Sequence, residues 1–298
     1  MNKTTSISVV IPFYGNPADT MPLIEQLQSQ ELSIPLEIIV SDDCSPTPFP
    51  DLEGVTVVRR KLNGGFGKAV NSGIEVAQSD WVFVLNSDLT IGPTFIADML
   101  SQKERHGVGV YSPQVVDHDG KGQWVGRKFP TAFHHACEWF TPLARFKGTT
   151  WWHRLVGHDT RCVTGKTVHT DWVVGACMLL PVEPFRAIGG FDPRFYMNSE
   201  EVDLQKRLTE NGVPSIFAGE VSVEHVGGGS SADDKRIGWL VDSRFIYAEK
   251  WGFKKQLHRS LTAVSYANFL VNVVRSLRNK DVHAQSILSK ELSYLKGH

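Results

Sequence analysis

In the first third of the chain, short apolar runs alternate with segments in which apolar residues recur at helical spacing. Apolar runs rich in β-favouring residues predict buried strands; they cover residues 7–13, 36–40, 55–58 and 81–85. The helical spacing predicts helices over 18–30 and 67–77. Strands and helices that alternate in this way predict an α/β fold with a mostly parallel (mixed) sheet flanked by helices.

Farther along, the pattern is less regular. Residues 107–170 are rich in Trp, His and Gly and predict strands plus a long excursion. The remaining apolar patterns predict a strand over 171–180, helices over 184–188 and 201–211, a strand over 221–226, and a mostly helical tail from Arg236. We expect one domain over 1–252, divided into two halves at about residue 106, and a helical C-terminal extension over 253–298.

Composition narrows the class of protein. The chain has 298 residues, 41% hydrophobic and 21% charged, with a net charge of −1, which argues against a dedicated nucleic-acid binder. Its four cysteines lack a Cys-x-x-Cys pair, and it starts without a secretion signal, so we expect a cytoplasmic protein with reduced cysteines. The apolar run 261–274 is too short to cross a bilayer and contains Ser265, Asn268 and Asn272.

Polar residues follow two of the predicted strands. Asn86-Ser87-Asp88 follows strand 81–85, and Asp42 and Asp43 follow strand 36–40. The carboxyl ends of strands in open α/β sheets are where ligands bind, and a carboxylate there can hold a divalent cation that holds a diphosphate. The alternatives are a polar turn after the first strand and an Asx-turn after the second.

Three further segments carry candidate chemistry. The segment 63–69 is glycine-rich and leads into a helix, which favours a phosphate but also suits an ordinary tight turn; it fits neither a Walker loop nor Gly-x-Gly-x-x-Gly. The carboxylates near residue 200 either favour the helix dipole or supply a general base in a pocket lined by Phe195 and Tyr196. His225 precedes the glycines 227–229 and is either a satisfied core residue or a metal ligand.

Taken in order, these segments resemble glycosyltransferase family 2, the inverting nucleotide-sugar transferases of GT-A fold. The resemblance spans about residues 6–252 and leans toward bacterial rhamnosyltransferase-like members. It implies that residues 1–106 form the nucleotide-sugar half of the domain and residues 107–252 the acceptor half. The matching segments are Ser8-Val9-Val10-Ile11-Pro12-Phe13-Tyr14, Val40-Ser41-Asp42-Asp43-Cys44-Ser45, 63–71, Leu85-Asn86-Ser87-Asp88, Trp172-Val173-Val174-Gly175-Ala176, 189–203 and Glu224-His225-Val226-Gly227-Gly228.

The resemblance implies roles for individual residues. The donor would be bound by Pro12, Tyr14, Asp42, Asp43, Gly65, Lys68, Asn86, Ser87 and Asp88. Asp88 would coordinate Mg²⁺ or Mn²⁺, with His225 as a further ligand. Glu201 would be the catalytic base, with Glu200 and Asp203 beside it, and Trp172, Gly175 and Ala176 would line the acceptor pocket.

The chain departs from the family's pattern at two motifs. The metal motif is often Asp-x-Asp, and here Asn86 stands first, so Asp88 and His225 would carry more of the metal binding. The base motif is often Glu-Asp, and here it reads Glu200-Glu201. The longer side chain moves the carboxylate by about 1.5 Å, enough to matter for attack geometry, so Asp203 stays a second candidate base.

The resemblance implies metal-dependent transfer of a sugar, rhamnose from dTDP-rhamnose in the first instance, to a hydroxyl of a glycan or lipid-linked saccharide in cell-surface polysaccharide synthesis. A UDP-hexose transferase of the same fold is an alternative. A sugar-1-phosphate nucleotidyltransferase is disfavoured because its signature loop does not follow strand 7–13. The alternative from another class is a partner that binds nucleotide-sugar or glycan without turnover.

The tail carries its own hypothesis. Basic residues flank the run 261–274: Lys254, Lys255, His258 and Arg259 before it, and Arg275, Arg278 and Lys280 after it. A basic-flanked amphipathic helix suits peripheral contact with an anionic membrane, such as the inner face of the plasma membrane. The alternative is a helix packed on the catalytic domain or against a second subunit of a homodimer.

Overall fold

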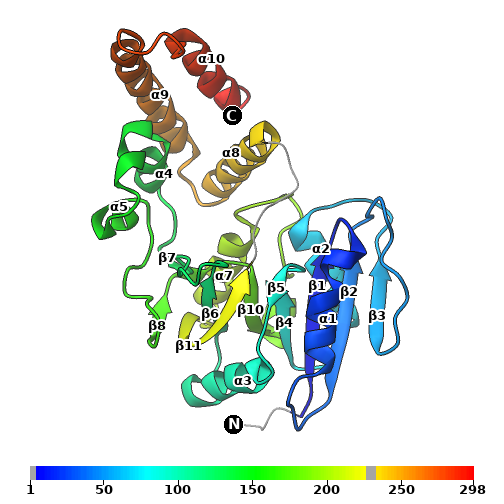
Figure 1. Cartoon of the computed structure of the whole chain (residues 1–298). Coiled ribbons are helices and arrows are strands. Elements are labelled where there is room, and N and C mark those ends of the chain that lie inside the picture. Colours follow the sequence, from blue (N-terminus) through cyan, green and yellow to red (C-terminus); the bar gives the residue numbers. More distant parts are fainter. Residues whose placement is uncertain (1–4, 226–232) are drawn as a thin grey trace. The chain divides into compact units, whose positions relative to one another are not determined.

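The structure, a computed structural model, describes residues 5–225 and 233–298, and the chain groups into two compact units. Unit 1 comprises Met1–Arg127 and Arg161–Gly229, and unit 2 comprises Lys128–Thr160 and Ser230–His298 (Figure 1). The functional boundary at residue 252 stays a prediction. The segment 128–160 and the residues from 230 onward belong to the same compact unit as the C-terminal helices.

Unit 1 is built on a nine-stranded mixed sheet. Its path is β3-β2-β1-β4-β10-β6-β11-β5, and β8 also pairs with β11. These strands are β1 (Ile7–Phe13), β2 (Leu36–Asp42), β3 (Val55–Arg59), β4 (Trp81–Leu85), β5 (Leu89–Thr90), β6 (Val110–Val116), β8 (Thr167–Thr170), β10 (Cys177–Pro181) and β11 (Ser215–His225). The contiguous strands β1 to β4 are parallel, as is the pair β6 and β11, whereas β5, β8 and β10 run antiparallel to their neighbours. This confirms the predicted fold class.

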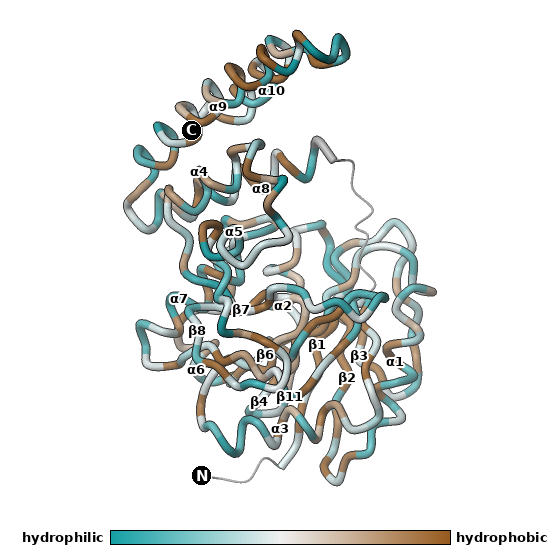
Figure 2. Tube along the Cα trace, turned by 60° about the vertical axis from the view of Figure 1, so that its left-hand side comes forward, coloured by the Kyte–Doolittle hydropathy of each residue, from teal (hydrophilic) through white to brown (hydrophobic). Residues whose placement is uncertain are grey.

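Helices pack on this sheet because its strands are apolar on both faces. Every residue of β4 is buried, as are nearly all of β1, and Figure 2 shows the hydrophobic colour gathered on these strands. The backbone of the helix after β3 comes so close to β1 that a Cβ on Gly73 would lie 2.4 Å from Val10 Cγ1. The helices of this unit are the 3-10 turn Pro17–Asp19, α1 (Met21–Gln28), α2 (Phe66–Val76), α3 (Phe95–His106), α6 (Val182–Ala187) and α7 (Glu200–Glu210).

The prediction of one strand over 171–180 is wrong. The segment forms two strands, β9 (Trp172–Val173) and β10, in different sheets, and β9 pairs with β7 (Gly126–Arg127). Between them the Val174 N–H donates to Val125 O at 3.1 Å, and Ala176 O accepts from the Asn86 N–H at 2.8 Å. An apolar run does not reveal this break, because both strands are buried.

The middle of the chain contains helices where only strands and an excursion were expected. They are α4 (Ala132–Trp139), the 3-10 turn Thr141–Phe146 and α5 (Thr150–Leu155). The last strand of the sheet, β11, begins at Ser215 rather than Val221. Val226, predicted to end that strand, and the glycine loop 227–229 lie outside the described residues.

Unit 2 is helical. Besides α4 and α5 it contains α8 (Asp233–Lys250), α9 (Lys254–Ser276) and α10 (Ala284–Leu295), and α9 and α10 lie side by side in Figures 1 and 2. Ala132, Val241, Phe245, Ala248, Leu257, Leu261 and Leu295 form its apolar cluster. Among the residues that the structure describes, no helix is long and apolar enough to cross a membrane.

Helix α9 buries its polar residues. Ser265, Asn268 and Asn272, which interrupt the apolar run, are at most 2% exposed. The Asn268 side chain accepts from the Thr141 N–H at 3.0 Å and donates to Trp139 O at 3.0 Å, and the Trp139 ring N–H donates to Ser265 Oγ at 3.0 Å. Hydrogen bonding compensates for burial of polar groups, so Ser265 and Asn268 anchor α9 to α4 and to the turn that follows it.

Candidate active site

The predicted site residues of unit 1 converge on one edge of the sheet. β1, β2 and β4 are parallel, so their carboxyl ends share an edge, and β10 is antiparallel to β4, so its first residue, Cys177, pairs with Leu85 at that edge. β6 runs antiparallel to β10, and β11 runs parallel to β6, which brings His225 to the same edge. Segments from residues 13 to 225 therefore meet there.

Asp88 and His225 lie together, as the metal hypothesis requires. Leu89, next to Asp88, pairs with His225 across β5 and β11, and the Asp88 Oδ1 to His225 Nε2 distance is 3.1 Å. The Asp88 side chain is 42% exposed, so it is open to solvent. Among the described residues no group of three or more His, Cys, Asp or Glu side chains could hold a metal. One carboxylate together with water and substrate phosphates is the usual ligand set of Mg²⁺, so Asp88 fits Mg²⁺ or Mn²⁺, with the His225 imidazole as the further ligand that the resemblance implies.

Asp42 and Asp43 are buried, and their carboxylates accept hydrogen bonds from backbone groups. Asp42 accepts from the N–H groups of Ser45 at 2.8 Å and Phe49 at 2.9 Å. Asp43 accepts from the Gly64 and Gly65 N–H groups at 2.7–3.0 Å. Asp42 thus makes the turn that the sequence left open as an alternative, and Asp43 fixes the glycine loop. Base and ribose binding by these residues stays a prediction.

The glycine loop is pressed against the segment before α7. Gly65 has φ +86°, and a Cβ there would lie 1.7 Å from Tyr196 O, so only glycine fits. The Tyr196 hydroxyl donates to Asn63 Oδ1 at 2.8 Å. Burial raises the pKa of Tyr196, and the charges of Asp43 and Tyr14 raise it further. These contacts gather the predicted donor residues Tyr14, Asp43 and Gly65 around Tyr196.

Two adjacent carboxyl groups begin α7. Glu200 is 4% exposed, and within the described residues neither Glu200 Oε2 nor Glu201 Oε2 has a hydrogen-bond partner. Burial raises the pKa of Glu200 well above its ordinary value, and the neighbouring Glu201 raises it further. Burial also raises the pKa of Glu201, against the lowering effect of its own backbone N–H and the charge of Arg127. An unpartnered buried carboxyl is what a proton acceptor needs before substrate arrives.

The pKa of Glu200 predicts a pH-dependent stability. A raised folded-state pKa means that the stabilising contribution of Glu200 is complete below the ordinary carboxyl pKa and is lost as the pH rises through the folded-state value. Each pKa unit corresponds to about 1.4 kcal/mol. Glu200→Gln should therefore raise the Tm by a few degrees at about pH 8 and leave it unchanged at about pH 4.

Thermal unfolding across this pH range measures the effect. Glu210→Gln, at the exposed end of the same helix, is the control and should shift the Tm little at either pH. A Tm difference between Glu200→Gln and the parent that is the same at both pH values would contradict the raised pKa.

The predicted acceptor residues lie beside Glu201. A Cβ on Gly175 would lie 3.5 Å from Glu201 Cβ, so Gly175 packs against the carboxylate's stem. The Gln205 side chain accepts from the Val173 N–H at 2.8 Å and donates to Val173 O at 2.7 Å, which joins α7 to β9. The Arg127 guanidinium lies over the Trp172 ring at 5.4 Å. Glu201, Trp172 and Gly175 thus form one cluster.

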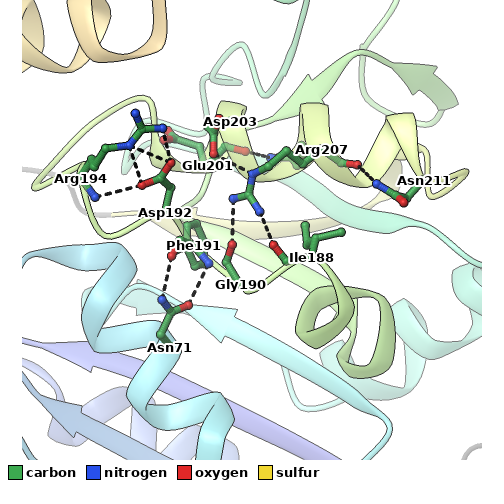
Figure 3. A network of polar contacts seen from close by, with 11 residues as sticks. Asn71, Ile188, Gly190, Phe191, Asp192, Arg194, Glu201, Asp203, Arg207 and Asn211 are labelled. Carbon is green, nitrogen blue, oxygen red and sulfur yellow. Dashed lines mark hydrogen bonds and ion pairs between the residues drawn. The ribbon is translucent and has the colours of Figure 1, made fainter. Parts of the chain in front are cut away.

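Asp203, the second candidate base, is held by an ion pair. It is 0% exposed, and the Arg207 Nε donates to its Oδ2 at 2.9 Å. Arg207 also donates to Ile188 O at 3.0 Å and Gly190 O at 2.8 Å. Figure 3 shows this network joining α7 to the loop before it. The observed contacts of Asp203 are those of a structural anchor, whereas its role as a base stays a prediction.

Several residues that position the site were not expected from the sequence. Arg60 donates to Asp43 Oδ1 at 2.7 Å and to Lys68 O at 3.0 Å. The Asn71 side-chain amide pairs with the backbone of Phe191, both contacts at 2.9 Å (Figure 3). The charge of Arg127 favours the ionised form of Glu201, and the Gln205 side chain is hydrogen-bonded to the backbone of Val173. No local pattern marks these residues, because their partners lie 8 to 120 positions away or, for Arg127, in another element.

A hollow of about 440 Å³ lies at the other end of β4. It is lined by residues including Ser79, Val182 and Arg186, next to Trp81, where β4 begins. The carboxylates and the Asp88–His225 pair lie at the carboxyl end of that strand, so this hollow is separate from the site.

Comparisons with known proteins place this geometry in a family. The chain is 27% identical over 208 residues to the N-acetylglucosaminyl-diphospho-decaprenol L-rhamnosyltransferase of Mycobacterium tuberculosis, covering 64% of this chain and 66% of the relative. It is 24% identical over 236 residues to the O-antigen biosynthesis protein RfbC of Myxococcus xanthus, covering 74% of this chain and 17% of the relative. The chain thus spans just under two thirds of the first of these relatives and far less of the second.

Solved structures share the fold at low identity. The crystal structure of GalNAc-T7 with UDP, GalNAc and Mn²⁺ matches with a TM-score of 0.60 at 13% identity, covering 89% of this chain and 51% of that one. The structure of S. aureus TarS 1-349 matches with a TM-score of 0.52 at 15% identity, covering 98% and 92%. The fold is therefore the expected GT-A type. The family model for glycosyl transferase family 2 matches residues 8–173, which is more than half of the chain. The chain therefore belongs to glycosyl transferase family 2.

Proposed function

We propose that this chain is an inverting, metal-dependent glycosyltransferase that moves rhamnose from dTDP-rhamnose to a hydroxyl of a glycan or lipid-linked saccharide in cell-surface polysaccharide synthesis. The mycobacterial relative, an L-rhamnosyltransferase, supports this choice of sugar, and the myxobacterial relative, an O-antigen biosynthesis protein, supports the choice of process. The observation that carries the proposal is the buried Glu201 Oε2, which has no hydrogen-bond partner among the described residues and lies at the same sheet edge as the Asp88–His225 pair.

Glu200 and Glu201, the two carboxyl groups at the start of α7, have different roles in proton transfer. Burial raises the pKa of both carboxyl groups, and the charge of Arg127 favours the ionised form of Glu201, so we assign the shared proton to Glu200. Glu201 is then the ionised member and takes the proton from the acceptor hydroxyl as that oxygen attacks the anomeric carbon from the face opposite the leaving group. Trp172 and Gly175 bound the space beside Glu201 in which the acceptor would lie.

The donor would lie along the sheet edge. Asp88 and His225 would hold Mg²⁺ or Mn²⁺, which when bound neutralises charge that develops on the diphosphate. The loop at Gly65, fixed by Asp43, would border the nucleotide, with Asn86 and Ser87 between the two. A UDP-hexose would be bound by the same residues. The two candidate donors, dTDP-rhamnose and a UDP-hexose, are therefore distinguished by which nucleotide the protein binds.

A thermal-shift panel tests the donor site. The nucleotides are dTDP, UDP, GDP, ADP and CDP, each with and without Mn²⁺. A ligand at about 100 times its Kd stabilises the folded state by about 2.7 kcal/mol, which should raise the Tm by several degrees. We expect a metal-dependent shift with dTDP.

Two variants at opposite ends of β4 make the panel specific. Asp88→Ala should abolish the metal-dependent shift, whereas Asp80→Ala, an exposed carboxylate just before β4, should retain it. A shift with UDP in place of dTDP would support the hexose alternative. No shift with any nucleotide would mean that this edge is not a donor site, and would favour a glycan-binding partner without turnover.

A further inference from the structure

Helix α9 turns an apolar face to solvent. Four large apolar residues of α9 are exposed: Tyr266 (51%), Leu270 (65%), Val273 (38%) and Val274 (59%). A fifth, Leu277 (82% exposed), directly follows the helix. At about 3.6 residues per turn they lie within about 100° of one another around the helix axis. We call these five residues the α9 stripe.

The stripe lies opposite the face by which α9 packs. The buried positions Leu257, Leu261, Ser265, Asn268 and Asn272 follow one another every three or four residues and are centred on the other side of the helix. The polar members of that face anchor α9 through hydrogen bonds to α4 and its flanking turn. Packing within unit 2 therefore does not account for the apolar residues of the stripe.

Basic residues share the face of the stripe and follow its end. By the same helical spacing, Lys255 and Arg259 lie on the line of the stripe, about four and three turns before Leu270, and both are exposed. Arg278 and Lys280, also exposed, directly follow Leu277. A face with cations at one end and aliphatic side chains at the other fits an interface between anionic headgroups and acyl chains.

The charge of the whole unit favours the same occupant. Unit 2 contains 16 Lys and Arg against 8 Asp and Glu, a formal net charge of +8, whereas unit 1 contains 15 against 24, a net charge of −9. The overall net charge of −1 conceals this division. A second copy of unit 2 would bring like charges together, whereas an anionic surface attracts them.

We propose that the α9 stripe and its flanking basic residues dock unit 2 on the surface of an anionic lipid bilayer, with α9 lying along the interface. The proposal does not depend on which sugar the chain transfers. It commits to a lipid surface rather than to a second subunit, because the charge complements only the first.

Co-sedimentation of the full chain with vesicles tests this proposal. Vesicles of phosphatidylcholine with phosphatidylglycerol should bind the protein, and vesicles of phosphatidylcholine alone should bind it far more weakly. Binding should weaken at high salt, because salt screens the attraction between exposed charges.

Matched variants separate the stripe from exposed apolar residues in general. Val274→Glu combined with Leu277→Glu should weaken binding at least about tenfold, since each buried aliphatic side chain contributes about a factor of ten or more. Val108→Glu combined with Leu62→Glu changes the same residue types in unit 1, at 51% and 77% exposure, and should bind as the parent does. Lys255→Gln combined with Arg259→Gln should weaken binding about fivefold for each charge removed.

Three results would overturn the proposal. They are absence of binding to anionic vesicles, equal loss of binding in the stripe variant and its unit 1 control, and a dimer in sedimentation equilibrium that only the stripe substitutions dissociate. The last would show that a second copy covers the stripe. The Lys255 and Arg259 variant keeps the test valid should the glutamate variant fail to fold.

Discussion

Glu201→Gln is expected to lower kcat about 10²- to 10⁴-fold and to leave donor binding close to that of the parent, because the amide keeps the shape of the side chain but cannot accept the acceptor's proton. Glu201 is suited to this role because its Oε2 is buried, has no hydrogen-bond partner within residues 5–225 and 233–298, and belongs to a side chain that packs against Gly175. Steady-state transfer kinetics give kcat, and the metal-dependent nucleotide shift reports donor binding.

The pH profile gives the same assignment a second readout. Burial raises the pKa of Glu201, so the rate should fall as the pH drops through a value above the ordinary glutamate range, where the base becomes protonated. Glu210→Gln on the same helix is the control and should turn over normally. Near-normal kcat for Glu201→Gln would remove Glu201 as the base and return Asp203 to consideration.

Arg207→Met is expected to destabilise unit 1 by about 3–5 kcal/mol, because it leaves the Asp203 carboxylate buried without its cation. Asp203 is 0% exposed and the side chain of Arg207 is 16% exposed, so solvent screens this pair little. The substitution also removes the donors to Ile188 O and Gly190 O. Chemical denaturation monitored by tryptophan fluorescence measures the change.

The neighbouring ion pair supplies the control. Lys206 and Glu210 are also four residues apart on α7, but they are 25% and 54% exposed, so Lys206→Met should change stability by at most about 1 kcal/mol. Asp203→Asn combined with Arg207→Met should be more stable than Arg207→Met alone, since the buried charge is then gone. Equal stability of the Arg207 and Lys206 variants would mean that the buried pair does not anchor the loop.

The strands could be predicted because their information is local. β1 and β4 read as apolar runs, and the structure places them at Ile7–Phe13 and Trp81–Leu85, since a strand covered on both faces has few polar residues to interrupt it. The break between β9 and β10 was missed for the same reason: a buried linker reads like a buried strand. The order of the motifs along the chain was sufficient to predict the family.

The neighbours of each candidate residue could not be predicted. The sequence shows two adjacent aspartates near the end of β2. In the structure, Asp42 accepts hydrogen bonds from the loop that follows, whereas Asp43 binds Arg60 and the backbone of the glycine loop. Asp88 and His225 were expected together only through resemblance, and it is the pairing of β5 with β11 that puts them 3.1 Å apart.

By itself, the sequence determined the α/β fold, the family and the set of polar residues available at the sheet edge, because periodicity and motif order are properties of neighbouring positions. Tertiary structure decided which of those residues are buried, charged or exposed. It left Glu201 Oε2 without a hydrogen-bond partner among the residues that the structure describes, buried the ion pair of Asp203 with Arg207, and turned α9 so that Asn268 is buried while Leu270 faces solvent. The physical reason is that burial depends on segments that lie far apart in the sequence, and no local pattern records it; even the Asp203–Arg207 pair, whose spacing of four residues is local, has its burial set by tertiary packing.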